Sequence, residues 1–352
     1  MSHRTNRRKS RQFGTVRLAA LTTALTAVCA AAAVPAAHAQ SERTQPERTQ
    51  SERAQSEPSE SSGPALRVLS HNVFLFSKLL HPNWGQDHRA AQIPRQDWFG
   101  GNDAVVLQEA FDNSSSDALL ENAADRYPHR TPVLGRSRDG WDATHGAYSA
   151  AAVEDGGVAV LSKWPIVRSE QYVYEEGCGI EALSQKGFVY TVLDVAGSNV
   201  HLVGTHTQST DPGCAQGRPA EVRSAQFREL SAFLDRKEIP ADEQVLVAGD
   251  FNVDSHSEEY PRMLADAGLA DVDSRSGLPY SFDTEDNSVA ADRYPDDPHE
   301  NLDHVLHREG HARPQSWGNE VVAERSEPWT VRSWGKEYTY TNMSDHYPVV
   351  GG

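Results

Sequence analysis

Short apolar runs, each about as long as a β-strand, recur along most of the chain. Most are rich in β-branched residues and are bounded by Gly, Pro or Asp, which is typical of strands buried between two sheets. A helical pattern begins at Pro219, a residue suited to a first helical turn. It places Phe227, Leu230 and Leu234 on one face. A second helix is expected within 114–128, between a serine-rich start and a proline. The apolar runs are LRVLSHNVF (66–74), AVVLQEAF (104–111), GGVAVLSKWPI (156–166), GFVYTVLDV (187–195), NVHLVGTHT (199–207), QVLVAGDFN (244–252), LDHVLHR (302–308), YTYTN (338–342) and HYPVV (346–350).

This alternation of paired strands with occasional helices predicts an α/β fold. We expect a sandwich in which two sheets pack face to face and the helices lie outside the sheets. No second linker interrupts residues 65–352, so they are predicted to form one domain.

The first 64 residues have a different composition. Residues 1–39 combine a basic start, an apolar run and an Ala-His-Ala ending, which predicts a signal peptide and a secreted, extracellular protein. Residues 40–64 repeat a short polar unit without aromatic or large aliphatic residues. Such a segment cannot bury enough apolar surface to offset its ordering entropy, so a disordered linker is predicted.

Charge and cysteine content narrow the class of protein. The predicted signal peptide holds six of the 33 Lys and Arg and none of the 50 Asp and Glu, so the remainder carries a formal net charge of −23. This charge disfavours strong counterion-release binding to nucleic acid, although a bound divalent metal could still support a nuclease. Cys178 and Cys214 are the two cysteines left after cleavage, which in a secreted protein favours a disulfide over two free thiols. On the chain-entropy model such a bridge contributes about 3–4 kcal/mol.

Polar residues stand at the ends of many of the apolar runs. Asp250 and Asn252 end one run, and strand alternation would put both on one face; the alternative is an ordinary turn. Each of the other polar residues at the ends of apolar runs could be a solvated carboxylate or a core histidine. Together, however, these residues predict a site at one edge of the sheets. The chemistry they suit is phosphoester hydrolysis, with oxygen ligands for a hard cation, a histidine base and phosphate donors. The set is Asn72, Glu109, His206, Asp250, Asn252, Asp303, His304, Asp345 and His346.

The motifs QEAF, THTQ, GDFN, LDH and SDHYP occur in this order. They resemble those of the metal-dependent endonuclease/exonuclease/phosphatase superfamily, whose fold is the deoxyribonuclease-I-like sandwich. The resemblance is closer to the secreted bacterial sphingomyelinases C and spans about residues 66–350. It implies Mg²⁺-dependent hydrolysis of sphingomyelin to ceramide and phosphocholine, with Mn²⁺ or Co²⁺ as substitute metals. The enzyme is expected to be a monomer.

The resemblance also implies roles for individual residues. Glu109 would be the principal metal ligand, with Asn72 and His346 beside it. His346 would also be the general base, supported by Asp303, and Asp345 would lie next to the metal. The residues expected to hold the phosphate and assist the leaving group are His206, Asp250 and Asn252.

A second divalent cation is implied at the edge of the molecule. Asn113, Glu154 and Asp155 fall on the family pattern for that site. The alternative is an acidic turn before Gly156 and Gly157.

Residues 328–340 are expected to form a β-hairpin that contacts the membrane surface. Trp329 and Trp334 are the predicted membrane contacts, because indole rings favour the membrane–water interface. The alternative is that one or both pack in the core. Gly335 departs from the family pattern, which often has a second aromatic residue there.

The superfamily acts on DNA, inositol phosphates and phospholipids, so the fold does not decide the substrate. The acidic chain and the aromatic hairpin favour sphingomyelin in membranes, and no nucleic-acid partner is expected. Two rival hypotheses remain: a secreted metal-dependent nuclease of the same superfamily, and a non-catalytic membrane-binding module.

Overall fold

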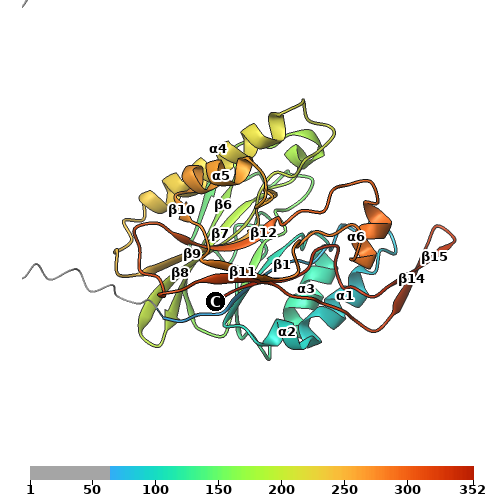
Figure 1. Ribbon diagram of the computed structural model, residues 1–352, viewed down its shortest axis with the longest axis horizontal. Coiled ribbons are helices and arrows are strands. Elements are labelled where there is room, and N and C mark those ends of the chain that lie inside the picture. Colours follow the sequence, from blue (N-terminus) through green and yellow to red (C-terminus); the bar gives the residue numbers. More distant parts are fainter. Residues whose placement is uncertain (1–63) are drawn as a thin grey trace, which may run out of the picture. The chain divides into compact units, whose positions relative to one another are not determined.

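The computed structural model describes residues 64–352 (Figure 1). The predicted signal peptide, and all but the last residue of the predicted linker, lie outside the described residues.

Two seven-stranded mixed sheets pack face to face, which confirms the predicted sandwich. In the first sheet, β1 and β2 lie parallel at the centre, with Asn72 paired to Gln108 at their ends. Its order is β11 (Ser274–Gly277), β13 (Gly318–Val321), β16 (Val349–Gly351), β1 (Val68–Asn72), β2 (Ala104–Gln108), β5 (Ala159–Ser162) and β3 (His129–Arg130).

The second sheet is built around a parallel pair, β8 and β9. Its longest strands are buried along most of their length, as expected for strands covered on both faces. Its order is β10 (Leu269–Ala270), β12 (Asp303–Arg308), β9 (Gln244–Asp250), β8 (Ser198–His206), β7 (Gly187–Val195), β6 (Ile166–Val173) and β4 (Ala143–Gly146).

The core between the sheets consists mainly of aliphatic side chains, such as Val106 and Val160 of one sheet and Leu202 and Leu246 of the other. Gly204 lets the sheets approach closely, because a Cβ atom there would lie 2.7 Å from Cγ1 of Val106. This close contact brings the ends of the central strands of both sheets together.

Helices cover the outer face of each sheet (Figure 1). The predicted helix at Pro219 is confirmed as α4, and its Phe227, Leu230 and Leu234 pack on the second sheet. The helix predicted within 114–128 is also confirmed as α3, although it ends at Asn122. The helices are α1 (Gln86–Gln92), α2 (Asp97–Gly100) and α3 (Asn113–Asn122) on the first sheet, then α4 (Arg218–Asp235), α5 (Glu259–Ala267) and α6 (Ser288–Arg293), with 3₁₀ turns η1 (Ile93–Arg95) and η2 (Gly179–Leu183).

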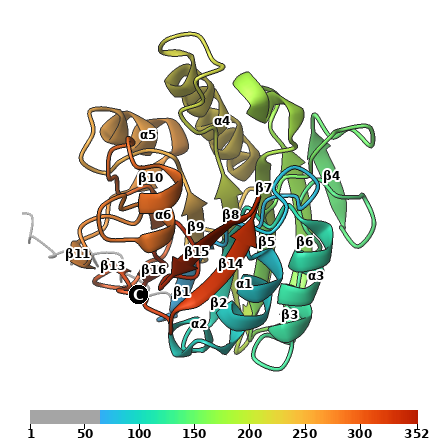
Figure 2. The same ribbon diagram turned by 90° about the vertical axis from the view of Figure 1, so that its right-hand side faces the viewer.

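The predicted hairpin is present as β14 (Trp329–Ser333) and β15 (Lys336–Tyr340). Trp334 and Gly335 form its two-residue turn, and both have positive φ angles (53° and 78°), as in the turn that best matches strand twist. Figure 2 shows the hairpin beside α1. It forms a small sheet separate from the sandwich.

The predicted disulfide between Cys178 and Cys214 is confirmed, with the two Cα atoms 5.4 Å apart. Among the described residues, none of the helices has the length and apolar character needed to cross a membrane.

Candidate active site

The strand ends of both sheets meet at one edge of the sandwich. In the second sheet, the register aligns His206 with Asp250 on neighbouring strands, and Asp250 with Asp303 on the next. In the first sheet, β1 ends at Asn72 and Glu109 directly follows β2. Asn72 Nδ2 donates to Asp250 Oδ2 at 3.1 Å, which joins the two sheets at this edge.

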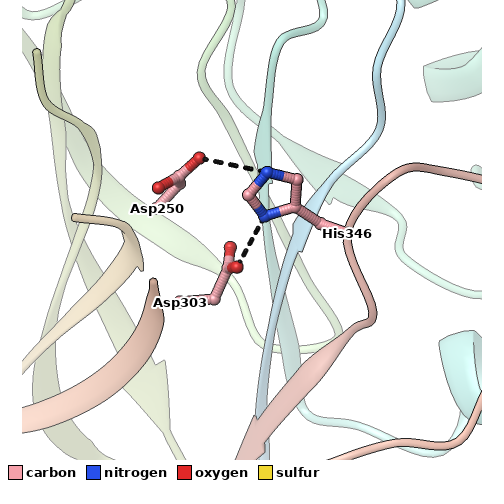
Figure 3. A group of neighbouring side chains, drawn as sticks. All are labelled: Asp250, Asp303 and His346. Atoms are coloured by element: carbon pink, nitrogen blue, oxygen red, sulfur yellow. Dashed lines mark hydrogen bonds and ion pairs between the residues drawn. The ribbon is translucent and has the colours of Figure 1, made fainter. Parts of the chain in front are cut away.

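His346 lies between two carboxylates (Figure 3). Its Nδ1 donates to Asp303 Oδ2 at 2.8 Å, and its Nε2 lies 3.9 Å from Asp250 Oδ2. One ligand atom from each of the three residues falls within 4.8 Å of the others, so the group could hold a metal ion. Because Nδ1 is committed to Asp303, the arrangement equally suits an oriented histidine that exchanges protons through Nε2.

The surrounding carboxylates set the protonation of His346. Burial lowers its pKa, but the charges of Asp303 and Asp250 outweigh this and hold the pKa well above the usual value. Burial raises the pKa of Asp303 to about 6, although His346 opposes the shift.

His206 has different neighbours and a different protonation state. Lys186 Nζ lies 3.0 Å from His206 Nε2, and because an ammonium can only donate, Nε2 must accept. Burial and the Lys186 charge hold the pKa of His206 well below its usual value. The ring is therefore neutral with its proton on Nδ1, and its 3.5 Å approach to Asp250 is not an ion pair.

Lys186 was missed by the sequence prediction. It also donates to the Thr207 carbonyl oxygen at 3.0 Å and to the Glu181 carboxylate, and it is 6% exposed. A lysine directly before the apolar strand β7 was the available signal, but its partners His206 and Thr207 lie 20 and 21 residues further along the chain.

Glu109 has the features of a metal ligand. Its Oε2 is buried without a hydrogen-bond partner in the part of the chain that the structure describes. Burial and the nearby Asp345 raise the pKa of Glu109 to about 8. An unpaired carboxylate oxygen close to the Asn72 amide and the Asp345 carboxylate suits a hard divalent cation, which would also stabilise the charged form. The residues therefore fit Mg²⁺.

Asp345 and Asn252 also lie at this edge. Ser344 Oγ donates to Asp345 Oδ1 at 3.1 Å, and burial raises the pKa of Asp345.

Asn252 Nδ2 donates to the Thr207 carbonyl oxygen at 3.1 Å. The expected strand alternation does not reach Asn252, because β9 ends at Asp250 and Asn252 has a φ of 49°. Its backbone N–H instead donates to Asp250 Oδ1 at 2.9 Å, so the stretch is both a turn and part of the site.

His304 was grouped with the site by its position in LDH, but it faces elsewhere. Its ring packs against Phe251 and Tyr260, and its Nε2 lies 3.0 Å from the Val253 carbonyl oxygen. It is a core histidine, the alternative considered for any single histidine.

An arginine side chain, that of Arg136, lies in the predicted edge metal site. Asp155 Oδ2 accepts from Arg136 Nε and its Oδ1 from the Gly157 N–H, both at 2.9 Å. Burial and Asp155 raise the pKa of Glu154 to about 7. Asn113 is exposed at the first position of α3. Arg136 already neutralises part of the charge there, and the second metal site remains a prediction.

The two tryptophans of the hairpin differ in exposure. Trp334 is 89% exposed at the turn. Trp329 is only 6% exposed, stacks on His88 of α1 at 4.6 Å between ring centroids, and donates from Nε1 to the Asn342 carbonyl oxygen. The prediction that Trp329 contacts a membrane is therefore wrong, because α1 covers its ring.

The fold and site define a class of phosphoesterase. The family described as Endonuclease/Exonuclease/phosphatase matches residues 69–346, and the chain belongs to this family. Its similar relatives include the sphingomyelinase C of Listeria ivanovii, which is 44% identical over 81% of this chain and 85% of the relative.

Solved structures agree with this placement. The crystal structure of sphingomyelinase C from Streptomyces griseocarneus is 65% identical, covers 82% of this chain and 99% of its own, and superimposes with a TM-score of 0.81. A structure of beta toxin from Staphylococcus aureus with bound magnesium ions is 44% identical, covers 81% of this chain and 98% of its own, and has a TM-score of 0.80.

Proposed function

We propose that the protein is a secreted, Mg²⁺-dependent phosphodiesterase that hydrolyses sphingomyelin to ceramide and phosphocholine. The observation that carries this proposal is the Asp303–His346 pair facing Asp250, with the unpaired Glu109 carboxylate at the same edge. The similarity to enzymes named sphingomyelinase C selects the substrate from those of the wider family.

The residues of the site divide the reaction between them. His346 Nε2 accepts a proton from a water molecule as the water oxygen bonds to phosphorus and the bond between phosphorus and the ceramide oxygen breaks. Asp303 holds the ring in place and stabilises the imidazolium that forms. His206 would pass its Nδ1 proton to the departing ceramide oxygen as Nε2 takes a proton from Lys186, so the ring stays neutral and the ammonium is the acid consumed. Asn252 and Asp250 position the phosphate.

Glu109 and Asn72 would hold the Mg²⁺, with Asp345 close by. The bound cation would supply positive charge that stabilises the phosphate oxygens in the transition state. Positive charge beside Asp250 would also lower the pKa of His346, so that Nε2 can accept a proton. We expect Mn²⁺ and Co²⁺ to substitute, and the edge residues Asn113, Glu154 and Asp155 to bind a second divalent cation.

Membrane contact is assigned to Trp334 at the hairpin turn, with Trp329 fixing the hairpin to the body of the enzyme. The enzyme would act as a monomer at the outer surface of a membrane. Its acidic character suits a zwitterionic headgroup and disfavours a nucleic-acid substrate.

The test is release of phosphocholine from sphingomyelin liposomes in Mg²⁺ and then in EDTA. We expect release that stops in EDTA, and a loss of nearly all turnover in His346→Ala with the fold preserved by circular dichroism. Normal turnover in that variant would refute the assignment. Nicking of plasmid DNA without lipid hydrolysis would instead favour the nuclease, and liposome binding with no hydrolysis the non-catalytic module.

A further inference from the structure

Large apolar side chains are exposed at two neighbouring points. Leu79 is 89% and Leu80 65% exposed in the loop that follows β1, and Trp334 is 89% exposed at the hairpin turn. Single exposed apolar residues need no explanation, but two adjacent leucines beside an exposed tryptophan form a cluster that marks an interaction surface.

The leucine loop is held in this outward conformation. Gln86, which is 2% exposed, donates from Nε2 to the carbonyl oxygens of Phe76 (3.0 Å) and His81 (2.8 Å). Its Oε1 accepts from the Trp84 N–H at 3.0 Å. These bonds fasten both sides of the loop to α1, so Leu79 and Leu80 are presented to the exterior by a preorganised backbone.

The loop and the hairpin are fastened to each other. Ser333 Oγ, next to the turn, donates to the Pro82 carbonyl oxygen at 3.0 Å. Gly85 has a φ of 81°, and a Cβ atom there would lie 2.5 Å from the Trp329 ring, so the loop end and the hairpin base pack without space between them. The two exposed points are therefore joined by direct contacts.

Most charges beside the exposed points are paired, and the exception is Lys336 after the hairpin turn, whose Nζ lies 4.6 Å from the centroid of the Tyr338 ring. Lys78 is paired with Asp87 and with Asp112 at 3.5 Å. Arg332, near the hairpin turn, is paired with Glu337 at 2.7 Å. A surface of apolar tips with a single free lysine suits a zwitterionic bilayer better than a strongly anionic partner. The paired charges carry no net attraction for an anion, and the lysine side chain can extend to the phosphate oxygens of choline phospholipids.

The loop also adjoins the catalytic edge. The Leu75 N–H donates to the Glu109 carbonyl oxygen at 3.0 Å, and the Asp112 N–H donates to the Leu75 carbonyl oxygen at 2.7 Å. A membrane held by the leucine loop would therefore lie close to the carboxylate assigned to the metal.

We infer that Leu79 and Leu80 form a second bilayer-docking point that acts together with Trp334 on membranes rich in choline phospholipids. This rests on the proposed function for its choice of lipid. Contact at both places, rather than at the hairpin tip alone, orients the enzyme on the bilayer, and burial of both leucines adds affinity in proportion to their apolar area.

The test is binding of the mature protein, residues 40–352, to vesicles of equal parts sphingomyelin and phosphatidylcholine, measured in EDTA so that no lipid is hydrolysed. We expect the double variant Leu79→Ser/Leu80→Ser to bind at least about tenfold more weakly than wild type. Val167→Ser is the matched control, because Val167 is 58% exposed at the start of β6, and it should bind as wild type does. Thermal unfolding confirms that each variant is folded.

A folded double variant that binds these vesicles like wild type would overturn the inference. So would a wild-type dimer that the double variant abolishes without change in vesicle binding, since the leucines would then meet a second copy of the chain. A dye attached at Leu79→Cys should shift to the emission of an apolar environment on vesicles, and an unshifted emission would count against insertion. Phosphocholine release by wild type from detergent-dispersed sphingomyelin tests the proposed function separately.

Discussion

At the scale of single residues, the site contains two histidines with opposite protonation. His346 lies among carboxylates that raise its pKa, whereas His206 accepts from Lys186 and has a lowered pKa. Pairs of titratable groups whose surroundings separate their pKa values are typical of acid–base catalysis. Glu109 adds a third shifted group, and it is also one of the few residues other than glycine with positive φ (56°).

The role of Lys186 can be tested by Lys186→Met. Loss of the ammonium removes the donor to His206 Nε2 and one cause of its lowered pKa, so we expect the pKa of His206 to rise and phosphocholine release to fall by about 100-fold. Nitrogen NMR of the histidine rings reports the tautomer directly. Lys163→Met, on the surface, is the control, and an unchanged tautomer with turnover within twofold of wild type would contradict the assignment.

If Glu109 binds the metal, replacing it should abolish the response of the protein to Mg²⁺ without lowering the stability of the metal-free fold. In Glu109→Gln an unpaired buried carboxylate is replaced by a neutral group of the same shape, so the free energy of unfolding without metal should not fall. We expect the rise in melting temperature on adding Mg²⁺ to disappear and turnover to fall at least about 100-fold. Glu121→Gln, exposed on α3, should keep both properties, and a normal Mg²⁺ response in Glu109→Gln would remove Glu109 from the metal site.

At the scale of elements, the hairpin combines a buried base with an exposed tip. Trp329 is enclosed by His88 of α1 and by Tyr340, whose ring centroid lies 5.1 Å away, while Arg293 of α6 donates to the Tyr340 hydroxyl at 2.9 Å. Two helices thus hold the base of β14 and β15 rigidly. The rigid base allows Trp334 to project without local collapse.

This division predicts opposite phenotypes for the two tryptophans. Trp329→Ala should lower the free energy of unfolding by about 3–5 kcal/mol, as for other large-to-small core substitutions. Trp334→Ala should change it by less than about 0.5 kcal/mol but weaken binding to sphingomyelin vesicles. Urea unfolding and vesicle sedimentation measure the two effects, and similar stability losses in both variants would contradict the assigned burial.

At the scale of the whole molecule, Glu170 connects separate parts of the second sheet and its helix layer. Its side chain is 1% exposed and accepts from Arg168 (2.6 Å), His145 (2.8 Å) and Lys237 (2.6 Å). Burial alone would raise its pKa, but the hydrogen bonds from Lys237, His145 and Arg168 lower it overall. The ionised form is therefore the one that stabilises the fold.

A lowered pKa means that this contribution is complete above the unfolded-state value, about 4.3, and is lost as the pH falls through the folded-state value. Glu170→Gln should cost about 1–3 kcal/mol of unfolding free energy at pH 7. The difference from wild type should shrink as the pH is lowered below about 4. A difference that stays constant from pH 7 to pH 3 in urea titrations would show that the charge of Glu170 is not involved.

The sequence by itself determined most of the framework of this protein. Apolar runs identified the central strands, periodicity identified α4 and α3, and the polar strand ends identified Glu109, Asp250 and His346 as members of one site. It did not predict the exposed edge strand β11, since Ser274–Gly277 has no apolar residue to signal a strand. These successes share a cause, because periodicity and strand ends are local properties that neighbouring residues specify.

Only the tertiary structure decided which groups are partners. Lys186 reaches His206, Arg136 reaches Asp155, and His304 turns into the core, and no sequence spacing specifies these contacts. The two tryptophans show the same limit, since both belong to one hairpin and the packing of α1 on Trp329 leaves only Trp334 exposed. Burial and charge depend on what the rest of the fold brings against a side chain, and that is settled only when distant segments pack together.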